Sequence, residues 1–205
     1  MPICPLCQNI SVPFFKDEFY ECSCCCGIFR PKEKLLDNEK EKERYESHTN
    51  DADDLGYQNF VSPITNSILN EYKKDDLGLD FGCGKDSPII KILRNNEYKI
   101  FGYDPYFFDD KKLLEQKYDY IACCEVIEHF YNPKKEFKLL KSLLKDNGTL
   151  YLMTGIYRQN IDFSKWWYKN DLTHVFIYKE ETFEWIKKEF GFKNMFIEKN
   201  FIKFG

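Results

Sequence analysis

The stretch that decides the fold is residues 79–88, which read LDFGCGKDSP. An apolar segment leads into Gly82 and Gly84, and Ser87 with Pro88 then supplies two residue types that start helices. Glycine accepts positive φ angles, so the pair predicts a tight turn whose backbone can approach a ligand closely. A strand, a glycine turn and a helix in this order are typical of the ligand-binding unit of an open α/β sheet.

On either side of this stretch, short apolar runs alternate with helical patterns. Because parallel strands are buried on both faces, near-continuous apolar runs predict such strands. They are expected at 77–82, 98–104, 118–124 and 149–155, with helices at 62–72, from Ser87, from Asn132 and over 179–190. Residues 195–204 read as two strands about a tight turn. We therefore expect a Rossmann-like open α/β sheet, mostly parallel, that closes with a C-terminal antiparallel hairpin.

Cysteines are concentrated at the N-terminus, where six of the nine lie within the first 26 residues. Without a secretion signal, such a cluster indicates metal binding in a reducing compartment more than disulfides. Two Cys-x2-Cys pairs separated by fourteen residues can bring four thiolates into the tetrahedron that zinc prefers. We therefore expect a small zinc ribbon with a structural Zn2+, in which Cys24 and Cys26 are spare thiols. The expected ligands are Cys4, Cys7, Cys22 and Cys25.

The organisation of the chain follows from a charged segment behind the cysteines. Residues 30–54 mix charges of both signs with little apolar pattern, which is typical of a solvated helix or a linker. Within it Arg44, Tyr45 and His48 are candidates, with Tyr57, for a lid over the ligand. The sequence predicts a zinc ribbon over 1–35, a linker or lid helix over 36–59 and the α/β domain over 60–205.

Composition narrows the classes of partner. The 205 residues are 43% hydrophobic, enough for a packed core, and the net charge of −4 does not favour binding to a polyanion. No apolar run reaches the roughly 18–20 residues that span a bilayer, and the first residues lack the pattern of a signal peptide. We expect a cytoplasmic protein that does not bind membranes, for which nucleic acid is a disfavoured partner.

The glycine turn also limits the ligand. A dinucleotide site has a third glycine where this chain has Ser87, and no Gly-Lys-Ser/Thr follows the turn to make a P-loop. Asp104 ends the next expected strand, 24 residues after Asp80, where a carboxylate can accept both hydroxyls of a ribose. Asp80 can hold the turn or an amino group of the ligand. These residues indicate a ligand with a ribose and without a pyrophosphate.

Four segments in order resemble the successive motifs of class I S-adenosylmethionine-dependent methyltransferases, in particular bacterial small-domain enzymes. They are LDFGCG at 79–84, GYDP at 102–105, YDYIACCEVIEHF at 118–130 and GTLYLMTG at 148–155. The resemblance covers residues 60–205 and implies a class I methyltransferase domain there, with S-adenosylmethionine as cofactor.

The resemblance also implies which residues would bind the cofactor. Family members commonly have a glycine where this chain has Asp86. Because S-adenosylmethionine carries no phosphate, a third glycine matters less, and Asp86 can act as a carboxylate at the start of a helix. Asp80, Gly82, Cys83 and Gly84 would line the methionine end, Asp104 would bind the ribose, and Cys124 and Glu125 would lie beside the sulfonium.

The segment EVIEHF places Glu125, Glu128 and His129 at helical spacing i, i+3 and i+4. Either Glu128 or His129 can be the catalytic base that takes a proton from the acceptor, or the three can bind Mg2+. E-x-x-E-H resembles the metal-ligand motif of ubiquinone-pathway O-methyltransferases and of small-RNA 2′-O-methyltransferases, and the second family implies His174 as a further ligand. A purely structural role for His129 is a third interpretation.

Aromatic residues crowd the segment FSKWWYKNDLTHVFIY, residues 163–178. So many rings in a connection favour an apolar wall for a flat or hydrophobic acceptor. The sequence therefore predicts methyl transfer to an oxygen or nitrogen of a small-molecule acceptor. Two alternatives stay open: an rRNA or tRNA methyltransferase that binds its substrate through the zinc ribbon, and a catalytically weak module that binds cofactor or protein.

Overall fold

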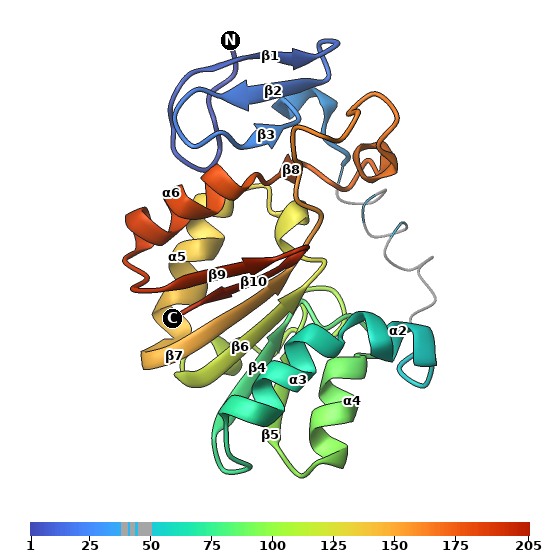
Figure 1. The fold of residues 1–205 in the computed structure, drawn as a ribbon, viewed down its shortest axis with the longest axis vertical. Helices are drawn as coiled ribbons and strands as arrows, with labels where there is room; N and C mark the ends of the chain where they lie inside the picture. The colour runs from blue at the N-terminus through green and yellow to red at the C-terminus, as the bar shows by residue number, and fades with distance from the viewer. Residues whose placement is uncertain (38–40, 42–43, 45–50) are drawn as a thin grey trace.

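The computed structural model describes residues 1–37, 41, 44 and 51–205. Tyr45 and His48, two of the expected lid residues, lie outside the described residues, whereas Arg44 and Tyr57 lie within them. Two sheets are present, and a small one lies above a larger one in Figure 1.

The larger sheet has six strands in the order β5-β4-β6-β7-β10-β9. The four expected parallel strands form its first part, and β9 and β10 close it as the expected antiparallel hairpin. This confirms the predicted Rossmann-like sheet. The strands are β4 (Leu77–Phe81), β5 (Lys99–Tyr103), β6 (Tyr118–Cys124), β7 (Leu144–Met153), β9 (Met195–Glu198) and β10 (Phe201–Phe204).

The order of the strands positions a ligand site. From β4 the chain moves outward to β5, and it then returns to place β6 on the other side of β4. In an open α/β sheet, ligands bind beyond the carboxyl ends of the strands at the point where the order reverses. The glycine turn at the end of β4 lies at this switch point.

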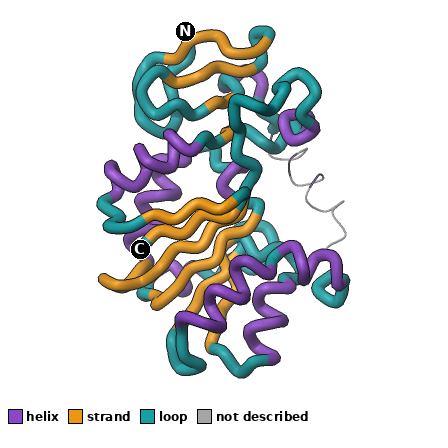
Figure 2. Tube along the Cα trace, viewed as in Figure 1, coloured by secondary structure: helices purple, strands orange, loops and turns teal. Residues whose placement is uncertain are grey.

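Helices cover both faces of the sheet (Figures 1 and 2). Apolar side chains of α3 and α4 pack with Tyr120 and Ala122 on one face, and those of α5 and α6 pack with Ile121 and Cys123 on the other. Side chains along β6 therefore alternate between two cores. The helices are α2 (Leu55–Phe60), α3 (Ser62–Glu71), α4 (Pro88–Asn95), α5 (Pro133–Leu143) and α6 (Glu180–Phe190).

The expected helix ends at Ser87, Asn132 and Gly191 are confirmed. The side chain of Ser87 accepts a hydrogen bond from the N–H of Ile90, and Asn132 does the same for Lys135. Gly191 ends α6 in the left-handed conformation, with φ of 69°. Shorter 3-10 segments are η1 (Lys32–Lys34), η2 (Lys111–Leu114), η3 (Ile127–His129) and η4 (Trp167–Asn170).

The smaller sheet is the cysteine-rich ribbon with one added strand. An antiparallel hairpin pairs β1 (Ser11–Phe15) with β2 (Phe19–Cys22), and β3 (Ile28–Phe29) pairs with β2 in turn. The fourth strand, β8 (Phe176–Ile177), comes from the aromatic connection after β7. This pairing joins segments almost 150 residues apart, and the sequence did not predict it.

The ribbon and the α/β part share one apolar core. All four cysteines of the two Cys-x2-Cys pairs are buried in the same cluster as Tyr178, Phe183 and Phe137. The ribbon therefore packs onto the main body over a continuous interface. Among the described residues, no helix is both long and apolar enough to cross a membrane.

Candidate functional site

The turn after β4 is built as the glycines predicted. Gly82 has φ of 79° and Gly84 has φ of 63°, and the N–H of Gly82 donates to the carbonyl of Tyr103, at 2.8 Å. A Cβ atom on Gly82 would lie 2.5 Å from a methyl group of Val126, so only glycine fits there. Cys83 between them is buried. The turn is thereby held tightly against the ends of β5 and β6.

Asp104, at the end of β5, ties two loops together. One carboxylate oxygen accepts the N–H of Gly84 at 3.0 Å, and the other accepts the N–H groups of Tyr106 and Phe107. The side chain is 8% exposed. Asp104 therefore lies beside the glycine turn, as expected for a ribose-binding carboxylate, and it also organises that turn.

Asp80 is buried beneath the turn at the end of β4. Its carboxylate accepts the hydroxyl of Ser87 at 2.5 Å. Burial raises the pKa of Asp80 to about 7, and the negative charge of Asp104 adds to this, while the Ser87 hydrogen bond opposes it. A cation at this point would favour the ionised form of Asp80.

A segment from before α2 closes over the turn. The N–H of Ala52, which is fully buried, donates to Asp86 at 2.8 Å. Asp86 therefore holds this segment, whereas the cap of α4 is Ser87. Burial raises the pKa of Tyr57, and the neighbouring acidic groups, which include Cys124 and Asp80, raise it further. Tyr57 lies on α2, directly after this segment, and it packs against the core cluster of α3 and α4; its part in a lid stays a prediction.

Glu128 anchors the second half of the site. Its side chain is fully buried, and its two oxygens accept the hydroxyls of Tyr168, at 2.7 Å, and of Thr154, at 3.0 Å. Tyr168 lies in η4 and Thr154 directly follows β7. Sequence reasoning did not assign Thr154 to the site, and it included Tyr168 only in the aromatic segment expected to form a wall for the acceptor. The only signals were the position of Thr154 at a strand end and the aromatic run around Tyr168.

His129 and His174 lie next to Glu128, with their ring centres 4.9 Å apart. The Nδ1 atom of His129 is 2.9 Å from the carbonyl of Thr173, and that of His174 is 2.7 Å from the carbonyl of Tyr168. Because a carbonyl only accepts, we assign the proton of each neutral ring to Nδ1. The lone pairs are then on the Nε2 atoms, and burial lowers the pKa of His174.

The histidine Nε2 atoms and a Glu128 oxygen form the second group of potential metal ligands in the described part of the chain. One ligand atom from each of Glu128, His129 and His174 lies within 4.8 Å of the others. The sequence also expected Glu125 in this set, but that residue lies beside the group. The three-residue spacing of the two glutamates falls on a short 3-10 segment, not on the α-helical turn that the spacing suggested.

Cys124 is the last residue of β6 and Glu125 follows it, between the two halves of the site. Glu125 has the unusual φ of 51°, and its N–H donates to the carbonyl of Met153 at 2.8 Å. Burial raises the pKa of Glu125 to about 9, and the negative charge of Glu128 raises it further. The neutral form of the Glu125 carboxyl is therefore favoured.

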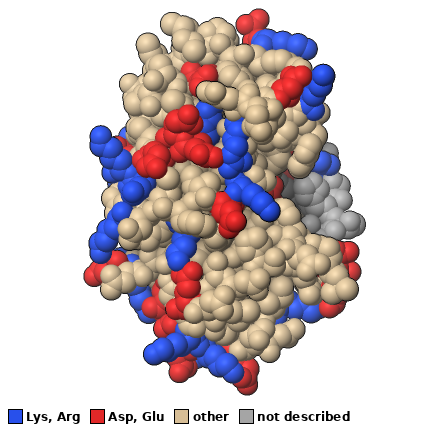
Figure 3. All heavy atoms as spheres, viewed as in Figure 1, with Lys and Arg blue, Asp and Glu red and all other residues tan. Residues whose placement is uncertain are grey.

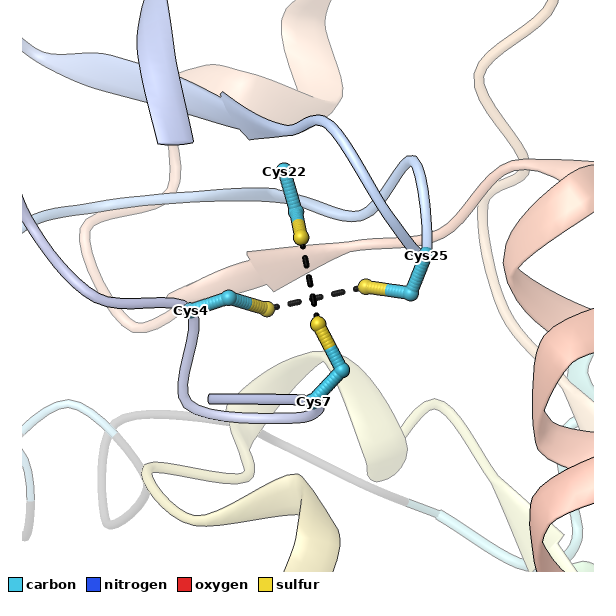
Figure 4. A group of neighbouring side chains, drawn as sticks. All are labelled: Cys4, Cys7, Cys22 and Cys25. Carbon is cyan, nitrogen blue, oxygen red and sulfur yellow. Dashed lines mark hydrogen bonds between the residues drawn. The ribbon is translucent and has the colours of Figure 1, made fainter. Parts of the chain in front are cut away.

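The four ribbon cysteines converge on one point (Figure 4). The sulfur atoms of Cys4 and Cys25 are 3.6 Å apart, and those of Cys7 and Cys22 are 3.2 Å apart. A zinc tetrahedron with bonds of about 2.3 Å has edges of about 3.8 Å, so small adjustments fit the ion. Cys24 is exposed and lies outside the group, in agreement with a spare thiol.

A separate groove of about 650 Å³ lies at the amino ends of β7 and β9. Its lining includes Glu71, Asn147 and Lys193. Since ligands of this fold bind at the carboxyl ends of the strands, the groove lies at the wrong edge of the sheet for the cofactor.

Comparison with known proteins identifies the family. The family model described as a methyltransferase domain matches residues 56–195. A curated relative, the tRNA U34 carboxymethyltransferase of Campylobacter jejuni, is 27% identical over 125 residues. That alignment covers 49% of this chain and 43% of the relative, so the chain spans less than half the length of the curated relatives it matches.

Two solved structures have a similar fold. Human N-acetylserotonin methyltransferase in complex with S-adenosylmethionine is 11% identical, with a TM-score of 0.55 over 82% of this chain and 56% of that one. Magnesium protoporphyrin IX methyltransferase from Synechocystis with bound S-adenosylhomocysteine is 16% identical. Its TM-score is 0.50, over 84% of this chain and 94% of that one. At these identities the likeness shows the fold.

The family match covers more than half of the chain, and it includes the glycine turn, Asp104 and the segment EVIEHF. The fold, the switch point and the family model agree with the resemblance found in the sequence. The chain belongs to the methyltransferase domain family, with the class I fold of S-adenosylmethionine-dependent methyltransferases.

Proposed function

We propose that this protein transfers a methyl group from S-adenosylmethionine to an oxygen or nitrogen atom of a small-molecule acceptor. The observation that carries the proposal is the glycine turn with Asp104, which lies at the switch point of a methyltransferase-family sheet. The methionine end would lie along Asp80, Gly82, Cys83 and Gly84, the ribose on Asp104, and the sulfonium beside Cys124 and Glu125.

His129 is the proposed base. With its proton on Nδ1, the ring presents the lone pair of Nε2, and its side chain is 15% exposed. Glu128 is fully buried and bonded to two hydroxyls, so it would act through the histidine and not on the acceptor itself. Alignment of the acceptor with the methyl group and removal of its proton would supply most of the rate.

A small molecule suits the surface better than RNA does. The net charge is −4, and acidic and basic side chains are interspersed on the face drawn in Figure 3. RNA is the second candidate because the Campylobacter relative is a tRNA-modifying enzyme by its name. In that case the ribbon would contact the RNA.

Two metal sites belong to the proposal. The four cysteines would hold a structural Zn2+, because four convergent sulfur atoms are its preferred ligand set. Glu128, His129 and His174 would hold a divalent ion that orients or acidifies the acceptor, as an alternative to direct base catalysis. Two imidazoles and one carboxylate suit Mn2+ or Zn2+ better than the Mg2+ that the motif resemblance implied.

Cofactor binding is the first test. Calorimetric titration of the zinc-loaded protein with S-adenosylhomocysteine should show micromolar affinity. Asp104→Asn keeps the shape of the side chain but removes its charge, and it should weaken binding at least about tenfold by loss of a charge-assisted hydrogen bond. Asp162→Asn, an exposed carboxylate of the connection, is the control and should bind like the wild type. Absence of binding by the wild type would overturn the proposal.

The acceptor class is tested next. The protein is incubated with methyl-labelled S-adenosylmethionine and, separately, with hydroxylated aromatics, aliphatic amines, carboxylic acids and total tRNA. Label transfer to a small molecule supports the proposal, and exclusive transfer to tRNA would replace it with the RNA alternative. Adding Mn2+ or Mg2+ to a reactive mixture then measures whether turnover depends on a metal ion.

A further inference from the structure

The loop of residues 168–175 supplies most of the contacts that organise the second half of the site. Tyr168 donates its hydroxyl to Glu128, and its carbonyl accepts the Nδ1 proton of His174. The carbonyl of Thr173 does the same for His129, and the N–H of Val175 donates to the carbonyl of Glu128 at 2.9 Å. Any displacement of this loop would therefore change both imidazoles.

Arg30, from the N-terminal ribbon, holds both ends of this loop. Its backbone N–H donates to the carbonyl of Val175 at 2.9 Å, directly after His174. Its guanidinium donates to the carbonyl of Lys169 at 2.6 Å, directly after Tyr168. One ribbon residue thus fixes the two points from which Tyr168 and His174 reach Glu128.

The position of Arg30 is in turn set by the ribbon. Arg30 directly follows β3, whose residues Ile28 and Phe29 pair with β8. Its side chain lies over the ring of Phe19, with 4.3 Å between the guanidinium carbon and the ring centre, and the residue is only 7% exposed. Just before β3, residues 22–27 form a turn that carries the second cysteine pair. The N–H of Cys22 donates to the carbonyl of Gly27 at 2.9 Å and closes this turn.

Close packing joins the cysteine cluster to β8. A Cβ atom on Gly27 would lie 2.2 Å from the ring of Phe176, so glycine lets the second cysteine pair rest directly on this strand. The ring of Phe29 stacks on that of Phe176, with ring centres 6.3 Å apart. The metal-binding turn, β3, Arg30 and the site loop are therefore contiguous.

We propose that Arg30 is a positioning residue for the catalytic half of the site, and that the ribbon serves as the scaffold through which the metal at the cysteines controls the orientation of His129 and His174. The catalytic role of these residues rests on the proposed function. The contacts of Arg30 with the loop, and the tautomers of His129 and His174, can be measured without any turnover. The ribbon would then hold the catalytic residues in position and would not serve to bind the substrate.

The test uses the side chains of the three histidines in the chain. Long-range proton–nitrogen NMR spectra report the tautomer of each ring. The wild-type protein, with one equivalent of zinc, should show Nδ1–H tautomers for His129 and His174. Arg30→Gln should convert His174, and to a smaller degree His129, to a mixture of tautomers. Arg30→Lys keeps the charge with a single donor group and should give an intermediate result.

Arg158→Gln is the matched control. Arg158 also donates from its guanidinium to a backbone carbonyl, that of Lys199, and it pairs with Glu180 at the start of α6. Its loss should leave both tautomers as in the wild type. An unchanged His174 tautomer in folded Arg30→Gln and Arg30→Lys, or an equal change in Arg158→Gln, would overturn the proposal. If Arg30→Gln does not fold, Arg30→Lys decides alone.

Two further measurements separate this inference from the proposed function. The affinity for S-adenosylhomocysteine should change by less than about twofold in Arg30→Gln, because distant sites add independently. Removing zinc with a chelator should give the same change of tautomer as Arg30→Gln, and an unchanged spectrum of the folded apoprotein would overturn the role given to the metal. Failure of the wild type to bind S-adenosylhomocysteine would count against the proposed function alone.

Discussion

The two halves of the site are constructed differently. The cofactor half, around Gly82 and Asp104, comes from one β-α-β segment, and its hydrogen bonds join residues about twenty positions apart. The half around Glu128 is assembled from η3, η4 and the end of β7, and Arg30 of the ribbon supports it from more than a hundred residues away. The first half depends on local backbone geometry, whereas the second depends on packing between distant segments.

We expect the largest effect from a change in the ribbon, which supports the half of the site around Glu128. Cys25→Ser should release the metal from the ribbon and lower the melting temperature by more than 10 °C, because structural zinc contributes about 10 kcal/mol or more in small ribbons. Metal content and thermal unfolding are the measurements. Cys24→Ser, which alters an exposed thiol outside the group, should keep the metal. Retention of metal by Cys25→Ser would mean that a neighbouring cysteine completes the site.

We expect the next largest effect from a change in the glycine turn of the cofactor half. Gly82→Ala adds a methyl group 2.5 Å from Val126 at a positive φ, and it should cost about 3 kcal/mol or more of the free energy of unfolding. Gly191→Ala is the control, since its φ is also positive but no atom lies within 4 Å of the added Cβ. It should cost only about 1 kcal/mol of backbone strain. Urea unfolding measures both, and equal losses would contradict the steric argument.

A smaller effect measures the contacts of Glu128. Tyr168→Phe removes the hydroxyl that donates to the buried carboxylate, and it should lower the free energy of unfolding by about 2 kcal/mol. Tyr120→Phe is the matched control, because its buried hydroxyl has no hydrogen-bond partner among the described residues. That change should be neutral or stabilising in the same urea titration. A loss in Tyr120→Phe as large as in Tyr168→Phe would show that the ring, not the hydroxyl bond, matters.

The smallest effect concerns charge in the cofactor half. The pKa of Asp80 is raised to about 7 by burial, so the carboxyl loses its proton as the pH rises through neutrality. If Asp80 binds the cofactor's ammonium group as proposed, only the ionised carboxylate attracts it, and the affinity for S-adenosylhomocysteine should rise about tenfold between pH 6 and pH 8. Calorimetry at both pH values measures this. Asp80→Asn should show weaker binding without that rise, and an equal rise in the variant would assign the titration to another group.

The same contrast explains what the sequence could predict. Glycine spacing, Ser-Pro and strand-end aspartates have local physical causes, so the sheet, the caps of α4 and α5 and the placement of Asp80 and Asp104 could be read directly. The cysteine pairs were equally clear because zinc fixes their spacing. The pairing of β3 with β8, and the contacts of Arg30 and Tyr168, depend on tertiary packing that no short motif records.

The spacing of the residues in EVIEHF gave a wrong prediction of local structure. Glu125, Glu128 and His129 suggest a helical turn, but the chain forms a 3-10 segment there and Glu125 adopts a left-handed conformation. The residue that completes the group is His174, which the resemblance had implied and which the connection after β7 delivers. The domain limits, the roles of the catalytic residues and the cytoplasmic location stay predictions.

The added strand β8 also has a consequence for the order of synthesis. The ribbon emerges from the ribosome before the methyltransferase sheet, and Ile28 cannot meet its partner Ile177 until the strands up to β7 have been translated. A contact of such large sequence separation forms slowly. During synthesis the ribbon would therefore have β3 as an unpaired edge strand. Early metal binding would keep the ribbon folded until β8 has been translated and can pair with β3.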